Sequence, residues 1–118
     1  MSEKFQKDLL RGSLDLMVLS VLSGGSQYGY SIQKKLATVS TGRIHLKAGT
    51  LYPLLHRLET EKLIKSRWDN STGRKRKWYE LTAKGKKRLK VQADQWQQYA
   101  DCMANLLSGF ITLDPKTS

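Results

Sequence analysis

The stretch GRKRKWYELT, residues 73–82, decides the fold of this 118-residue chain. A glycine precedes four consecutive cations, which lead into a short run of residues that favour a β-strand. Tyr79 and Leu81, two positions apart, would point to the same side of that strand, toward a core. The pattern predicts one strand of a hairpin whose turn projects positive charge outward, as a wing does. The four cations are Arg74, Lys75, Arg76 and Lys77.

Such a cation cluster favours an anionic partner, because close packing of like charges costs free energy. A phosphate backbone is the obvious partner, and a solvated, lysine-rich hairpin tip is the alternative interpretation. The formal net charge of +11 is concentrated, since residues 62–90 carry twelve Lys or Arg against two acids. Residues 1–61 contribute only +3 and residues 91–118 contribute −2. This uneven distribution favours a nucleic-acid footprint.

Several classes of protein do not fit the composition. One cysteine, Cys102, allows no intrachain disulfide, which fits a reducing cytosol. The N-terminus lacks a signal-peptide pattern, and the apolar run Leu14–Leu22 is too short to span a bilayer. No catalytic motif is found, and His45 and His56 are too isolated for a metal site. We therefore expect a cytoplasmic, single-domain protein that is not an enzyme, is not membrane-bound, and needs no metal or cofactor.

The other elements follow from hydrophobic periodicity and glycine stops. The predicted elements are helix Asp8–Leu22, a helix from Tyr28 to Ser40, helix Ala48–Lys62, strands Leu63–Trp68 and Lys77–Leu81, and a long helix that Thr82 caps. Pro53 is expected near the first turn of the third helix, where a missing N–H costs little. Three helices and a two-stranded wing predict a mainly α fold, a winged helix-turn-helix with an added C-terminal helix.

Apolar residues of the last predicted helix recur at heptad spacing, which predicts packing against a partner helix. Leu89, Trp96, Met103 and Phe110 are seven apart, and Ala93, Ala100 and Leu107 fall between them. We expect a dimer whose interface contains Leu89, Trp96, Met103, Leu107 and Phe110. The expected organisation is a DNA-binding winged helix over residues 1–82, a dimerisation helix over 83–110, and a tail over 111–118.

Four segments together resemble the PadR family of transcriptional regulators along nearly the whole chain. They are Tyr28-Gly29-Tyr30, the run GTLYPLLHRLE at 49–59, Gly73-Arg74 with Lys77-Trp78-Tyr79, and LTAKG at 81–85. The family more often has Tyr where this chain has Trp78. The single C-terminal helix is similar to the smaller subfamily, which includes multidrug-sensing repressors.

The resemblance implies a homodimer that binds a palindromic operator in double-stranded DNA and represses a neighbouring gene. It implies that the third helix enters the major groove while the wing touches the backbone or minor groove. It also implies that the C-terminal helices dimerise, and that a small molecule bound near their interface can release the DNA.

Candidate DNA contacts near or on the third helix are Lys47, Thr50, Tyr52 and Arg57. Hydroxyls and lysines can bind phosphates, and a helix N-terminus favours an anion. An ordinary solvated helix face is the alternative. Arg57, one turn further along, could hold a phosphate or could pair with Glu61 at i+4.

Trp96 is a candidate effector-binding residue, with Ala93 and Ala100 leaving space beside it. In multidrug-sensing relatives a Trp fourteen residues after the helix-opening Thr stacks flat aromatic ligands, and Thr82 to Trp96 has that spacing. The alternative is that Trp96 fills a dimer core. Cys102 is expected to be a buried structural residue in preference to a redox switch, because no cation lies near it in sequence.

Two functions remain open. One is a homodimeric, effector-released repressor with a planar aromatic ligand; the other is a constitutive nucleic-acid-binding winged helix without an effector. A protein-interaction winged helix is a third, which the charge density disfavours. The heptad seam favours the repressor, because a dimer matches a two-fold operator.

Overall fold

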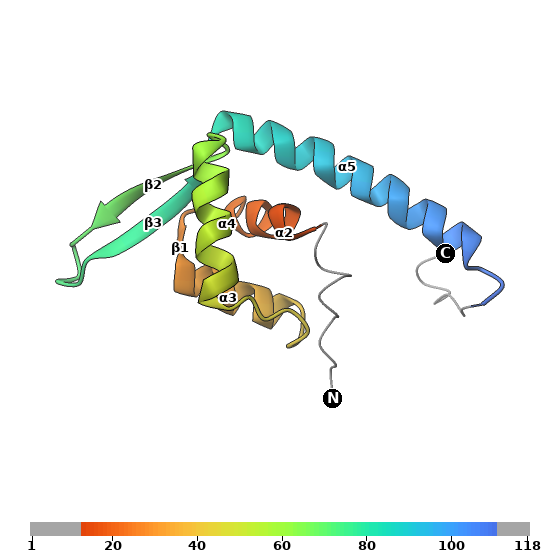
Figure 1. Ribbon diagram of the computed structural model, residues 1–118, viewed down its shortest axis with the longest axis horizontal. Coiled ribbons are helices and arrows are strands. Elements are labelled where there is room, and N and C mark those ends of the chain that lie inside the picture. The colour runs from red at the N-terminus through yellow and green to blue at the C-terminus, as the bar shows by residue number, and fades with distance from the viewer. Residues whose placement is uncertain (1–12, 111–118) are drawn as a thin grey trace.

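Three short helices pack around one apolar core, with a hairpin leaving it on one side and a long helix on the other (Figure 1). The structure is a computed structural model, and it describes residues 13–110. The elements are α2 (Leu14–Leu22), β1 (Gln27–Tyr28), α3 (Gly29–Val39), α4 (Ala48–Thr60), β2 (Ile64–Asp69), β3 (Arg76–Leu81) and α5 (Ala83–Leu106). This arrangement confirms the predicted winged helix with an added C-terminal helix. The first part of the predicted helix at Asp8–Leu22 and the predicted tail lie outside the described residues.

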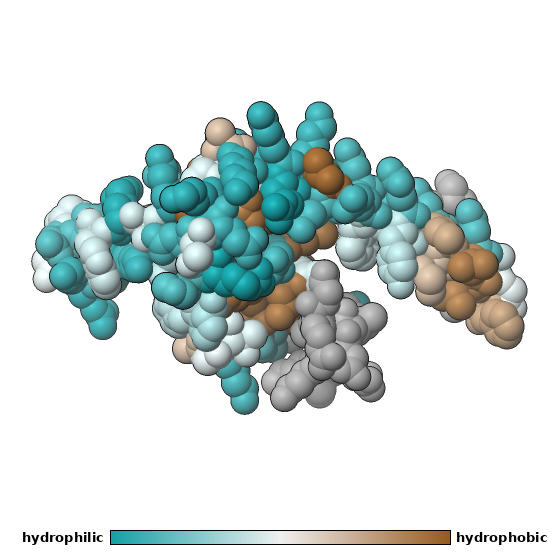
Figure 2. All heavy atoms as spheres, turned by 45° about the horizontal axis from the view of Figure 1, so that its top comes forward, coloured by the Kyte–Doolittle hydropathy of each residue, from teal (hydrophilic) through white to brown (hydrophobic). Residues whose placement is uncertain are grey.

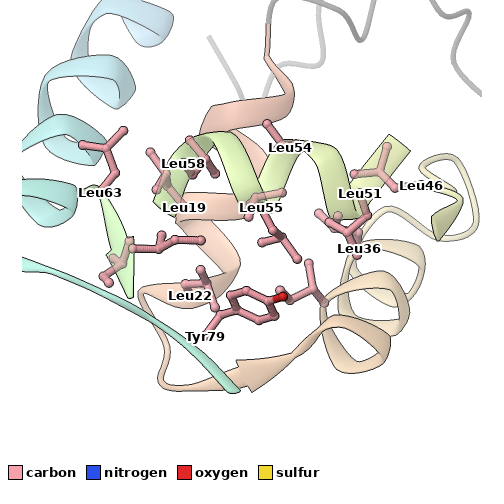
Figure 3. Close-up of a cluster of buried hydrophobic side chains, with 14 residues drawn as sticks. Leu19, Leu22, Leu36, Leu46, Leu51, Leu54, Leu55, Leu58, Leu63 and Tyr79 are labelled. Carbon is pink, nitrogen blue, oxygen red and sulfur yellow. The ribbon is translucent and has the colours of Figure 1, made fainter. Parts of the chain in front are cut away.

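The core is almost entirely aliphatic and is centred on α4 (Figure 3). Four leucines that recur at helical spacing along α4 are all buried. They pack with buried residues of α2, α3 and the sheet, and with Leu46 from the loop before α4. The four leucines of the stripe are Leu51, Leu54, Leu55 and Leu58.

The sheet has three strands in the order β1-β3-β2, one more than the sequence predicts. β2 and β3 are antiparallel, and Ile64 lies opposite Leu81 while Ser66 lies opposite Tyr79. β1 pairs with the outer edge of β3 through only two residues, Gln27 and Tyr28. A strand of two residues is too short to show an alternating pattern in the sequence. It forms only where β3 offers a free edge to pair with.

Pro53 lies at the sixth position of α4, just past the first turn near which it was expected. At this position an ordinary residue would donate its N–H to the carbonyl of Gly49, and proline cannot. α4 begins at Ala48, as predicted, with Lys47 as its extended N-cap residue, so Pro53 lies in the second turn, where an N–H would have a partner within the helix.

The first turn of α5 is fastened to the backbone at the base of the hairpin. The Thr82 hydroxyl accepts the Gly85 N–H at 3.0 Å, which confirms the predicted N-cap. The same hydroxyl donates to the carbonyl of Lys62 at 2.7 Å, and the Thr82 N–H donates to the carbonyl of Leu63 at 3.1 Å. A Cβ on Gly85 would collide with that Leu63 oxygen, so only glycine allows the approach.

The last helix ends four residues earlier than predicted, at Leu106. Leu107 caps it, and a turn follows in which the Phe110 N–H donates to the Leu107 carbonyl at 2.8 Å. The heptad pattern continues past the end of the helix to Phe110. Hydrophobic periodicity does not show where a helix stops, and Ser108 and Gly109, which follow the C-cap residue, are the signal of the stop. Within residues 13–110, no helix is both long and apolar enough to cross a membrane.

We expect Gly85→Ala to lower the free energy of unfolding by about 1–3 kcal/mol, because the new methyl group meets backbone that cannot rotate away. Gly49→Ala is the matched control, since nothing lies within 4 Å of a Cβ built on Gly49. That variant should lose no stability, because alanine is the better helix former. Urea unfolding at one fixed protein concentration compares the two, and equal stability would show that the joint at Leu63 tolerates a side chain.

Candidate nucleic-acid interface

The hairpin, the start of α3 and one side chain of α4 enclose an open groove of about 920 Å³. Its lining is aromatic and cationic, a combination suited to sugar and phosphate. We call it the wing groove. Its lining residues are Tyr28, Gly29, Tyr30, Ser31, Lys34, Tyr52, Trp68, Arg74, Lys75, Arg76, Lys77 and Tyr79.

The four predicted wing cations divide into two at the tip and two on the flank. Successive side chains of a strand point to opposite faces, so Arg76 and Lys77 leave β3 on opposite sides. Arg74 and Lys75 precede β3 and are exposed. The ammonium of Lys75 lies 4.8 Å from the centre of the Trp68 ring, a cation–π contact at the exposed end of the hairpin.

Arg76 is held by Tyr28, the residue that β1 places beside it. Its Nη1 donates to the Tyr28 hydroxyl at 2.7 Å, and its guanidinium carbon lies 4.7 Å from the ring centre. Trp78 meets the same ring edge-on, with the ring centres 4.4 Å apart. The indole N–H of Trp78 in turn donates to Asp69 at 3.0 Å. These contacts stiffen the hairpin and orient Arg76 along the groove.

Lys77 leaves β3 on the face that looks toward α4, and it also lines the wing groove. Its Nζ lies 3.9 Å from a carboxylate oxygen of Glu59, and that carboxylate also accepts the Ser66 hydroxyl at 2.5 Å. It lies 5.8 Å and 5.7 Å from the ring centres of Trp68 and Tyr79. Part of its charge is therefore balanced inside the chain, so the uncompensated charge of the wing lies at its tip.

The structure brings three of the four predicted α4 residues to exposed positions near the start of that helix. Lys47 is its N-cap residue, Thr50 lies in its first turn, and both are exposed. Tyr52 is 45% exposed and lines the wing groove. Its ring lies directly on Gly29, where a Cβ would be 2.6 Å from the Tyr52 Cζ. The glycine of Tyr28-Gly29-Tyr30 therefore leaves the space that the Tyr52 ring occupies in the groove.

Arg57 is not brought to the groove. Its Nη2 donates to Asp15 Oδ1 at 2.5 Å, and its Nη1 donates to Asp15 Oδ2 at 3.1 Å and to Glu61 Oε2 at 3.0 Å. Hydrogen bonding to Asp15, and then to Glu61, raises the pKa of the Arg57 guanidinium above its ordinary value. The pairing with Glu61, one of the two alternatives for Arg57, is present, and the Asp15 partner, 42 residues away, was missed. We therefore assign Arg57 to an intramolecular network.

Trp96 borders a different hollow, which we call the α5 cleft. Its volume is about 430 Å³, and it lies where α2, α4 and α5 meet. Ala93 and Ala100 do not line it, although they neighbour Trp96 in the heptad pattern. Among the described residues, the Oε1 atom of Gln92 is buried without a hydrogen-bond partner. The cleft is lined by Asp15, Leu16, Arg57, Gln92, Gln95, Trp96 and Tyr99.

The heptad residues of α5 differ in their surroundings. Leu89 packs partly against the core of its own chain, and Met103 is half-buried. Trp96 is 50% exposed and Phe110 is 87% exposed. Figure 2 shows an apolar patch at the far end of α5, where Leu106, Leu107 and Phe110 are exposed.

Cys102 is also exposed in the single chain, so the expectation of a buried structural cysteine was wrong. Cys102 lies on the part of α5 that extends past the core. The residues around it in the sequence do not indicate this. In the described part of the chain, no group of three His, Cys, Asp or Glu is placed to hold a metal ion.

Seven residues that line the groove were not predicted as DNA contacts: Tyr28, Gly29, Tyr30, Ser31, Lys34, Trp68 and Tyr79. The segment 28–34 comes to the groove through the fold, and its sequence alone does not indicate this. Trp68 is 57% exposed, an unusual position for a large aromatic side chain.

Comparison with known proteins identifies close relatives of the chain. Residues 18–91 match the transcriptional regulator PadR-like family. A PadR family transcriptional regulator of Eggerthella lenta is 40% identical with a TM-score of 0.72, covering 85% of this chain and 82% of that one. A PadR-like transcriptional regulator of Bacillus cereus is 33% identical with a TM-score of 0.76, covering 86% and 97%. An uncharacterized protein of Lysinibacillus sphaericus is 30% identical over 88% of this chain and 96% of its own length.

Replacing Arg74 and Lys75 together with alanine should weaken binding to every duplex by a similar factor, because phosphate contacts carry no sequence information. The slope of log K against log salt should flatten by about 0.9 for each phosphate that the variant no longer neutralises. Fluorescence anisotropy titrations at several salt concentrations measure this slope. The control replaces Lys87 and Lys90 of α5, which removes the same charge away from the wing groove. An unchanged slope in the wing variant would exclude contact between the tip and DNA.

Proposed function

The chain belongs to the PadR-like family of transcriptional regulators, and we propose that this DNA-binding regulator acts as a homodimeric repressor that a small molecule releases from its operator. It is not an enzyme. The observation that supports the DNA-binding surface best is the wing groove, in which Tyr52 of α4 and the cations of the hairpin line one open hollow. In this proposal residues 1–82 bind the operator and residues 83–110 dimerise.

The start of α4 is the part that would read bases. It presents Lys47, Thr50 and Tyr52, whose side chains can donate hydrogen bonds to phosphates or base edges. The wing tip, with Arg74 and Lys75, would lie against the neighbouring backbone or minor groove. Two such units related by a two-fold axis would match a palindrome.

The outer half of α5 supports dimerisation. The far end of this half projects beyond the rest of the chain (Figure 1), while α5 also contacts α2 and β3. It nevertheless carries large apolar side chains, which a second copy could remove from water. The proposed interface consists of Leu89, Trp96, Met103, Leu107 and Phe110.

A flat guest beside Trp96 would provide the release step. Trp96 borders the α5 cleft and is half exposed, so an aromatic ring could stack on it. Ala93 and Ala100 would leave further space on the side that faces a second copy. The guest would lower operator affinity if it bound the DNA-free conformation more tightly.

A palindrome recovered by selection from random duplexes tests the base-reading part of the proposal. Thr50→Ala should cost roughly 1–3 kcal/mol on that palindrome and less on random duplex, because the variant has no hydroxyl to reach a base. Tyr52→Phe should behave in the same way if its hydroxyl reads a base. Thr60→Ala, at the other end of α4, is the matched control and should bind both duplexes normally.

Equal effects on palindrome and random duplex would assign Thr50 to backbone positioning. Failure to recover any palindrome, together with equal affinity for random DNA and RNA, would instead favour a constitutive nucleic-acid-binding module.

A planar cationic dye should quench Trp fluorescence and weaken operator binding in the unaltered protein. Trp96→Ala should abolish both effects, whereas Trp68 and Trp78, which are in the wing, should contribute little to the quenching. Direct binding of dye to DNA would weaken the complex equally in both proteins, so the variant also controls for that. Val91→Ala removes an exposed apolar side chain of α5 that is outside the predicted seam, and should behave like the unaltered protein.

Sedimentation of the same proteins tests the dimer. If Trp96→Ala remains dimeric and binds the dye as tightly, Trp96 is not the ligand platform. If it dissociates into monomers, Trp96 is a residue of the dimer core.

A further inference from the structure

One carboxylate stands beside the wing groove and faces a wing cation. Glu59 lies near the end of α4 and is partly buried. Its Oε1 atom lies 3.9 Å from the Lys77 ammonium, and its Oε2 atom accepts the Ser66 hydroxyl at 2.5 Å. Within residues 13–110, Lys77 is the only one of the four wing cations that forms an ion pair. Glu59 is therefore the anion that the chain itself supplies to its wing.

The two oxygens of Glu59 are held differently. The bond from Ser66, on the neighbouring strand β2, fixes the carboxylate in place, because hydrogen bonds to a charged acceptor are the strong ones. The Lys77 ammonium lies beyond hydrogen-bond distance, so the attraction between charges draws it there. The negative charge is thus fixed, and the lysine is the partner that can move.

Lys77 has a second possible partner in the wing groove. Its side chain lines the groove, whereas Glu59 does not. A phosphate in the groove and the Glu59 carboxylate would therefore compete for one ammonium, since each offers it anionic oxygens. The carboxylate belongs to the same chain and is always close to the lysine, which gives it the advantage of a high effective concentration.

We propose that Glu59 substitutes for a backbone phosphate: it keeps Lys77 from the DNA and lowers the affinity of the protein for duplexes of every sequence. This inference rests on the DNA-binding surface proposed above and is independent of any effector. Backbone contacts carry no sequence information, so a residue that removes one of them leaves a larger share of binding to base contacts. Glu59 is a positioning residue, because it acts through Lys77.

Glu59→Gln should strengthen DNA binding, whereas damage to the fold would weaken it. Glutamine can still accept the Ser66 hydroxyl, but it has no charge to hold Lys77. At about 0.1 M salt the affinity for a random-sequence duplex should rise roughly 3- to 10-fold, and the slope of log K against log salt should steepen by about 0.9, the value for one further phosphate contact. Fluorescence anisotropy titrations at several salt concentrations measure both quantities. A slope that does not steepen would overturn the proposal.

Glu80→Gln is the matched control, because Glu80 forms a similar ion pair on the same sheet. Its carboxylate lies 3.7 Å from the Lys65 ammonium, and neither residue lines the wing groove. The variant therefore changes the net charge by the same amount and frees a lysine away from the groove. Its salt slope should equal that of the unaltered protein. Equal steepening in Glu59→Gln and Glu80→Gln would assign the effect to net charge and would also overturn the proposal.

Lys77→Gln tests the same inference without altering Glu59. With Glu59 present, this change should leave the salt slope almost as it was, because Lys77 contacts the carboxylate and not a phosphate. Arg74→Gln, at the wing tip, should flatten the slope by about 0.9. In the Glu59→Gln background, Lys77→Gln should return the slope to that of the unaltered protein. If Lys77→Gln flattens the slope as much as Arg74→Gln while Glu59 is present, Lys77 reaches the DNA regardless and the proposal is wrong.

The two proposals can fail separately in these experiments. If the unaltered protein binds no duplex, the DNA-binding surface and the role of Glu59 are both wrong. If it binds duplexes but Glu59→Gln binds them more weakly and unfolds at lower urea concentration, Glu59 only joins the hairpin to α4, and the DNA-binding surface stands. Should Glu59→Gln fail to fold, the comparison of Lys77→Gln with Arg74→Gln decides the question alone.

Discussion

The carbonyl of Leu63 is the point on which the arrangement of the domain depends. It follows the end of α4, it directly precedes β2, and it accepts the N–H of Thr82 at the end of β3. Gly85 lets the first turn of α5 lie against the same oxygen. α4, both strands of the hairpin and α5 all meet at this carbonyl. The contacts between them here are made by backbone atoms, which, unlike side chains, cannot adapt by changing rotamer.

The hairpin extends from this joint, and the alternation of side chains along β3 decides which of its four cations have partners within the chain. Alternation along β3 sends Arg76 to Tyr28 and Lys77 to Glu59, where each has partners in the chain. Arg74 and Lys75 precede the strand and remain at the exposed tip. A run of four equal charges in the sequence thus becomes two cations that stiffen the wing and two that are available to a phosphate backbone.

Local signals in the sequence were enough to predict most of the fold. The leucine stripe of α4, the cap at Thr82 and the hairpin at 63–81 each depend on residues close in sequence. Features that depend on distant residues were missed: β1 exists only because β3 offers an edge, and Arg57 finds Asp15 from 42 residues away. The wing cations and Tyr52 were predicted as separate DNA contacts and they line one groove, whereas Arg57 faces a different cleft. Periodicity placed Arg57 on α4 without indicating which neighbour its side chain would meet.

The contact between Tyr52 and Gly29 has a consequence for how this chain can diverge. The two positions lie 23 residues apart in sequence, yet the ring of one occupies the space where the other would carry a Cβ. A larger residue at 29 requires a smaller ring at 52 or one that swings aside into solvent, whereas a smaller residue at 52 is compatible with glycine at 29. We therefore expect the constraint to run in one direction: descendants that keep the aromatic ring in this position keep glycine at 29, and those that lose the ring are free to replace the glycine.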